Sequence, residues 1–145
     1  FMLQFNYGND IYNATRLYAT QTNTQRRNQL AEVADRWSPT NASNKVPRYN
    51  GYVVNDVYSR FVEDGSFLRL KNITLGYTLP HKWTRSFHVS KLRVYATGQN
   101  LFCLNNYSGY DPEVSTASKS PMTPGLDWGA YPKSRVFTFG IDLQF

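Results

Sequence analysis

The sequence predicts an all-β protein whose long antiparallel strands form part of a transmembrane β-barrel. Aromatic residues make up 16% of the 145 residues, with 11 Tyr, 9 Phe and 3 Trp, yet the mean hydropathy is low at −0.54. Barrel strands produce this combination because they alternate apolar residues facing lipid with polar residues facing inward. The alternating segments are also separated by connections of very unequal length, which is typical of outer-membrane barrels.

The final strand is predicted over residues 134–145, where apolar and polar residues alternate with a period of two. About ten residues at roughly 3.3 Å each, tilted by about 40°, cross a hydrocarbon band about 25 Å tall. We therefore expect one face of this strand to contact lipid, although an edge strand of a soluble sandwich would show the same alternation. That face consists of Phe137, Phe139, Ile141, Leu143 and Phe145.

Three further strands are predicted upstream of the final one. Residues 91–103 alternate in the same way, and a shorter strand is predicted near residues 1–7. In residues 66–79 the apolar positions change parity halfway along the segment. A β-bulge near Lys71 and Asn72 would keep the apolar side chains on one face.

The connections between these strands follow the order long, short, long. Residues 8–65 and 104–132 are long and polar, whereas residues 80–90 form a short turn. Long loops without structure of their own are uncommon in compact soluble domains. Outer-membrane barrels alternate longer extracellular loops with short periplasmic turns. We therefore expect two external loops and one periplasmic turn, with Trp83 as an interfacial anchor and a short helix near residues 27–36.

A barrel cannot close with three or four strands, because even small barrels need about eight. The sequence begins at Phe1, within a predicted strand, and no signal segment precedes it. We therefore expect the chain to be part of a longer polypeptide and to pair with the rest of the barrel.

Four segments, in their order and spacing, resemble the end of SusC/RagA-type TonB-dependent transporters and cover most of residues 35–145. They are Asp35-Arg-Trp-Ser-Pro39 with Pro47-Arg48, Asp64-Gly-Ser-Phe-Leu-Arg-Leu-Lys-Asn-Ile-Thr-Leu-Gly-Tyr-Thr-Leu-Pro80, Asn100-Leu-Phe102 with Tyr107-Ser-Gly-Tyr-Asp-Pro-Glu-Val114, and Tyr131-Pro-Lys-Ser-Arg-Val-Phe-Thr-Phe-Gly-Ile-Asp-Leu-Gln-Phe145.

This resemblance implies the last three to four antiparallel strands of a large barrel of about 22 strands, plugged by an N-terminal domain. It implies a location in the outer membrane of a Gram-negative bacterium and TonB-dependent import of an oligosaccharide or peptide. A SusD-like surface lipoprotein would close the outer mouth, and the TonB complex would act through the missing N-terminal part. The apolar row ending at Phe145 would be the C-terminal insertion signal. No enzymatic activity and no cofactor are implied.

The second long connection holds the candidates for contact with a ligand or with the lid protein. Aromatic side chains dominate many recognition surfaces, although an aromatic belt at the membrane interface or packing between loops is the other interpretation. Asp111 is a candidate too, but the Asp-Pro-Glu sequence around it is also typical of a turn with capped backbone amides. The candidates are Tyr107, Tyr110, Asp111, Trp128 and Tyr131.

Other kinds of chemistry have little support in the sequence. The net charge is +6, but the basic residues are dispersed, so nucleic-acid binding is not expected. Cys103 is the single cysteine, which excludes a disulfide within the chain. His81 and His88 have no Cys, Asp or Glu beside them, so neither a metal site nor a hydrolase triad is expected. The alternative function is a soluble β-sandwich that binds carbohydrate through surface aromatics.

Overall fold

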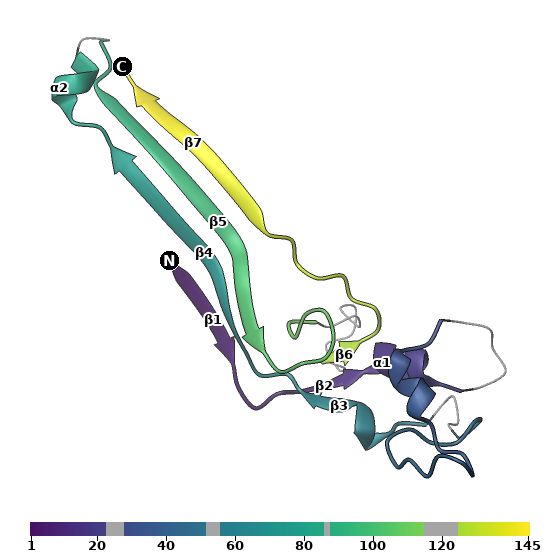
Figure 1. Cartoon of the computed structure of the whole chain (residues 1–145). Coiled ribbons are helices and arrows are strands. Elements are labelled where there is room, and N and C mark those ends of the chain that lie inside the picture. Colours follow the sequence, from purple (N-terminus) through teal and green to yellow (C-terminus); the bar gives the residue numbers. More distant parts are fainter. Residues whose placement is uncertain (23–27, 52–55, 86–87, 115–124) are drawn as a thin grey trace. The chain divides into compact units, whose positions relative to one another are not determined.

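The computed structural model describes residues 1–22, 28–51, 56–85, 88–114 and 125–145 of the chain (Figure 1). The chain divides into two compact units. The first, here called the sheet unit, comprises Phe1–Tyr7, Phe67–Asn105 and Pro132–Phe145. The second, here called the loop unit, comprises Gly8–Ser66 and Asn106–Tyr131.

The sheet unit is a 4-stranded antiparallel sheet with the strand order β1-β4-β5-β7. The strands are β1 (Met2–Asn6), β4 (Phe67–Thr78), β5 (Lys91–Asn105) and β7 (Val136–Gln144). They occupy the segments in which apolar and polar residues alternate. A single helical turn, α2 (His81–Thr84), joins β4 to β5. Both long connections leave the sheet at its other end, where β1 and β5 finish and β4 and β7 begin.

The strand register separates the side chains into an apolar face and a polar face. On the apolar face Ala96 of β5 lies opposite both Leu75 and Phe139. On the polar face Thr97 lies opposite Thr74, and their hydroxyl oxygens are 2.9 Å apart. The apolar face is exposed, with 71% exposure for Leu75 and 79% for Phe139. Because these large side chains lie uncovered in a row, this face is suited to contact with another apolar medium or surface.

The β-bulge predicted near Lys71 is confirmed. Lys71 is the extra residue of β4 relative to β1. Relative to β5, Leu70 pairs with Phe102 and Asn72 pairs with Gln99, so Asn100 and Leu101 both lie opposite Lys71. Asn100 adopts a left-handed backbone with φ of 52°, a conformation that asparagine tolerates better than most residues. The bulge keeps the apolar positions of both halves of β4 on one face.

The loop unit contains a small 3-stranded sheet with the order β3-β2-β6. Its elements are β2 (Asp10–Asn13), α1 (Ala14–Thr20), η1 (Ala31–Asp35), η2 (Ser59–Phe61), β3 (Val62–Asp64) and β6 (Leu126–Asp127). β2 runs antiparallel to β3 and parallel to β6. Leu17 and Phe61 form a buried apolar cluster, with Tyr12 and Tyr58 packed against it. The helix expected near residues 27–36 is a short 3-10 helix, η1, and the α-helix lies earlier in the chain.

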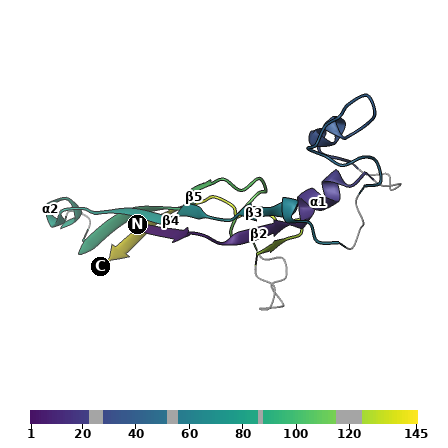
Figure 2. The same cartoon turned by 90° about the horizontal axis from the view of Figure 1, so that it is seen from below.

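The sheet unit is a single layer, as Figure 2 shows for β4, β5 and β7. A β-sandwich would cover the apolar face with a second sheet, and no second sheet exists among the described residues of this unit. The sandwich interpretation is therefore not the observed fold. None of the described helices is both long enough and apolar enough to cross a membrane.

Candidate functional site

A network of ion pairs in the loop unit begins at helix α1. Asn13 caps this helix, because its side-chain oxygen accepts a hydrogen bond of 2.8 Å from the Arg16 N–H. The Arg16 guanidinium donates two bonds to Glu32, from Nε at 2.9 Å and from Nη2 at 2.8 Å. Its Nη1 donates to Glu63 at 3.1 Å. This fork geometry joins α1, η1 and β3.

Glu63 connects this network to the second long connection. Its carboxylate accepts the Ser108 backbone N–H at 3.0 Å and the Ser108 hydroxyl at 2.8 Å. Burial opposes the charged form and is the largest single influence on Glu63, but the bonds from Ser108, Arg16 and Asn13 together outweigh it. The pKa of Glu63 therefore lies below its ordinary value. The Arg16 bond likewise lowers the pKa of Glu32, against a smaller opposing effect of burial.

A second polar pair holds the end of the second long connection. The Tyr107 hydroxyl donates to Asp127 Oδ2 at 2.6 Å, and the Ala130 N–H donates to Asp127 Oδ1 at 3.1 Å. Both members of the pair are buried. Burial, followed by the bond to Asp127, raises the pKa of Tyr107. The hydroxyl therefore stays protonated and keeps donating to the carboxylate.

A pocket of about 410 Å³ lies beside these two groups of residues, within the loop unit. Its wall includes Arg16, Glu32, Ser108, Tyr110 and Asp127. The charged groups of this wall are already engaged by partners in the same unit. Ala19 and Leu30 also line the pocket, so its wall combines satisfied polar groups with apolar side chains and an aromatic ring.

The structure places the predicted contact residues in two different environments. Tyr110, Trp128 and Tyr131 are exposed, and Tyr110 contributes to the pocket wall. Trp128 lies against Tyr18 of α1, with ring centroids 5.8 Å apart. Tyr107 and Asp111, in contrast, are buried.

Asp111 holds the turn that its sequence context suggested. Its Oδ1 accepts the Glu113 backbone N–H at 2.9 Å, which is the local bonding of an Asx turn. Tyr107 and Asp111 thus support the conformation of the connection, while the three exposed aromatic residues offer their rings to solvent.

The residues predicted to face lipid lie at the edge of the sheet unit. Phe137, Phe139, Ile141 and Leu143 follow the apolar face of β7, and all of them are exposed together with Phe145. Their neighbours across the sheet are Gly98, Ala96, Val94 and Leu92. Among the described residues, no group of three or more His, Cys, Asp or Glu side chains is placed to hold a metal ion.

Comparison with known proteins gives consistent relatives. No protein-family model matches the chain. It is 36% identical to TonB-dependent receptor P3 of Formosa agariphila over 98% of the chain and 14% of that receptor. It is 42% identical to TonB-dependent receptor SusC of Bacteroides thetaiotaomicron over 59% of the chain and 8% of SusC. The chain therefore spans a small part of the length of these curated relatives.

Solved structures agree with the sequence relatives. The chain superimposes on a structure of the RagAB peptide transporter with a TM-score of 0.81 and 26% identity. The match covers 99% of this chain and 15% of the other. The antiparallel sheet, its exposed apolar face and these matches lead to one conclusion: the chain belongs to the SusC/RagA type of TonB-dependent receptors, as a segment from the C-terminal part.

Proposed function

We propose that the complete protein is an outer-membrane nutrient importer and that this chain supplies the last strands of its barrel. In this proposal residues 8–65 and 104–132 are external loops and residues 80–90 form a periplasmic turn. The exposed apolar face of the sheet unit carries the proposal, because a single-layered sheet with such a face is stable where lipid covers it. The receptors and the peptide transporter that the chain resembles support the same function.

The proposed import is TonB-dependent and takes up an oligosaccharide or a peptide. A SusD-like lipoprotein would act as the lid, and the TonB complex would pull on the N-terminal part of the protein, outside this chain. Conformational change would drive transport, so none of the present side chains has a covalent role.

The exposed aromatics of the loop unit are the proposed contacts with substrate or lid. Tyr110 borders the pocket, and Trp128 and Tyr131 expose large rings in the same unit. Such rings stack well on sugar faces and pack well against protein partners. Tyr110→Ala in the complete protein should weaken substrate or lid binding, whereas Tyr49→Ala, at another exposed tyrosine of this unit, should not.

The proposed function is tested with the complete protein in its native bacterium. A strain lacking the gene should fail to grow on one glycan or peptide source, and the restored gene should recover growth. The protein should be extracted from the outer-membrane fraction only with detergent, together with a surface lipoprotein. If a variant that cannot engage TonB also restored growth, import would not depend on TonB. Recovery in the soluble fraction without detergent would contradict the barrel itself.

A further inference from the structure

We propose that the turn between β4 and β5 binds the anionic headgroups of a phospholipid bilayer. We call residues 80–85 and 88–91, which contain α2 and the first residue of β5, the cationic turn. This inference concerns a different surface from the pocket and the contact aromatics. It rests on the proposed function, because it requires the sheet unit to be in a membrane.

The cationic turn gathers positive charge and contains no Asp or Glu. Lys82, Arg85 and Lys91 are all exposed, and none of them belongs to an ion pair among the described residues. The sequence contains no Asp or Glu from residue 65 to residue 110. The acidic residue of the sheet unit is Asp142, and it lies opposite Arg93 in the strand register. The cationic turn therefore has a positive field that an anionic surface would neutralise.

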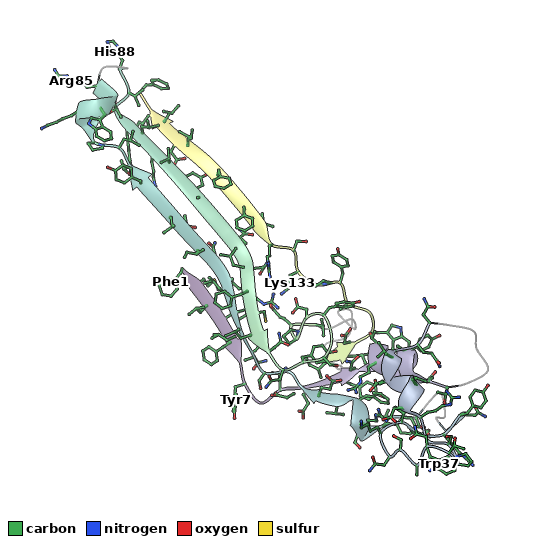
Figure 3. All side chains as sticks on the ribbon, viewed as in Figure 1. Phe1, Tyr7, Trp37, Arg85, His88 and Lys133 are labelled. Atoms are coloured by element: carbon green, nitrogen blue, oxygen red, sulfur yellow. The ribbon has the colours of Figure 1, made fainter. Side chains whose placement is uncertain are left out.

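Backbone hydrogen bonds link the described residues of the cationic turn. The Trp83 N–H donates to the Pro80 carbonyl at 2.9 Å, and the Val89 N–H donates to the Thr84 carbonyl at 3.3 Å. Thr84 is buried, while the side chains on either side of it are exposed. Figure 3 shows Arg85 and His88 projecting outward from this end of the sheet. Within the described residues, these bonds fix the backbone beside Lys82 and Arg85, which reduces the conformational entropy that binding would cost.

The apolar face of the sheet continues directly to this turn. The Ser90 N–H donates to the Gln144 carbonyl at 2.7 Å, so the last residues of the turn lie beside the end of β7. Tyr77 and Leu143 are exposed near this end of the sheet. Trp83 is exposed within the turn itself. Apolar strands, an exposed tryptophan and exposed cations therefore lie together at this end of the sheet, as hydrocarbon, interface and headgroups adjoin in a bilayer.

A lipid surface fits these observations better than an acidic protein does. A soluble acidic partner would neutralise the charges. It would not explain why the charges lie beside an exposed apolar face and an exposed tryptophan. A bilayer with anionic lipids accounts for all three features together. Each Lys or Arg near such a surface is expected to strengthen binding by roughly fivefold, and salt should weaken the effect.

The test uses the complete receptor, folded in detergent and depleted of lipid. Phosphatidylglycerol and phosphatidylcholine are titrated separately, and the bound lipid is counted by native mass spectrometry. The variants combine Lys82→Gln, Arg85→Gln and Lys91→Gln. The matched control keeps every charge through Lys82→Arg, Arg85→Lys and Lys91→Arg. A second control, Lys133→Gln, removes one charge before β7, at the other end of the sheet.

The proposal predicts that the original receptor prefers phosphatidylglycerol and that the glutamine variant loses most of this preference. The charge-conserving and Lys133→Gln controls should keep it, and phosphatidylcholine binding should be equal in all four proteins. Equal phosphatidylglycerol binding by the glutamine variant would overturn the inference. So would binding of an acidic protein to the turn without any lipid preference. A receptor that needs no detergent would instead refute the proposed function, so the two failures are distinguishable.

Discussion

Replacing Phe139 with arginine should strongly destabilise the protein in a bilayer. β7 runs from Val136 to Gln144, so Phe139 lies one residue from its middle. At roughly 3.3 Å per residue and a tilt of about 40°, one residue changes depth by about 2.5 Å. Phe139 would then lie about 2.5 Å from the midplane, where an arginine on the lipid face costs roughly 2–4 kcal/mol.

The neighbouring residue provides a matched control. Thr138 points to the polar face and lies opposite Thr97, so Thr138→Arg should cost less than about 1 kcal/mol. Leu143→Arg, on the apolar face but about 8 Å from the midplane, should cost roughly 1 kcal/mol because it is closer to the interface.

The assay is equilibrium urea unfolding of the complete receptor in lipid bilayers. Where unfolding is not reversible, the folded fraction is measured by the gel mobility of unheated samples. An equal loss of unfolding free energy for Phe139→Arg and Thr138→Arg would refute the assignment of the apolar and polar faces. Equal costs for Phe139→Arg and Leu143→Arg would refute the proposed depth.

Three further predictions concern the loop unit. The pKa of Glu63 is lowered from its ordinary value of about 4.5, so the ionised carboxylate stabilises this unit at pH values above 4.5. This stabilisation is lost as the pH falls through the lowered pKa. Glu63→Gln should therefore reduce the acid sensitivity of this unit and leave the part due to Glu32, measured as hydrogen-exchange protection corrected for the intrinsic rate at each pH. Tyr107→Phe should cost about 1–3 kcal/mol, because the carboxylate of Asp127, which is 3% exposed, would lose a hydrogen-bond donor; an unchanged melting temperature would contradict this role. Gly125→Ala should destabilise the protein more than Gly129→Ala, although both glycines have positive φ. A Cβ at Gly125 would lie 2.7 Å from a backbone oxygen, whereas a Cβ at Gly129 would meet nothing within 4 Å. Equal melting temperatures of the two variants would contradict this difference.

The strands of the sheet unit could be predicted because each one carries its own signal. A two-faced strand needs a period of two, and the apolar positions of β7 show it without reference to any other segment. The bulge at Lys71 was visible for the same reason, since the parity of the apolar positions changes there. The matching irregularity in β5 could not be predicted from the sequence. Asn100 and Leu101 lie opposite Lys71 only because of how β4 and β5 pair, and the sequence of β5 alone does not reveal this pairing.

The loop unit could not be predicted in the same way, because its structure depends on distant partners. β2 and β6 are short, and Tyr12 pairs with Leu126 from far along the chain. Strands of this length carry no measurable alternation, and their pairing is decided by tertiary contacts. The sequence also does not indicate that strands from both long connections form one small sheet, with β2 and β3 from the first connection and β6 from the second.

The polar network was absent from the predictions for a related reason. Arg16, Glu32 and Glu63 are separated in sequence, and isolated charges of this kind usually belong to solvated surfaces. The aromatic character of the second long connection did identify Tyr110, which borders the pocket. The same signal also selected Tyr107, which is buried, because composition does not distinguish a ring that supports a loop from a ring that is available for contact.

Spin labelling of β7 in the complete receptor shows whether the apolar face of this strand contacts lipid. Single cysteines are placed in turn at residues 136–144 in a Cys103→Ser background, and the receptor is reconstituted into bilayers. The accessibility of each label to oxygen, which concentrates in lipid, is compared with its accessibility to a water-soluble nickel complex. We expect high oxygen accessibility at Phe137, Phe139, Ile141 and Leu143, alternating with low values at the residues between them. Uniform accessibility along the strand, or nickel accessibility at Phe139 and Ile141, would contradict a lipid-facing barrel strand.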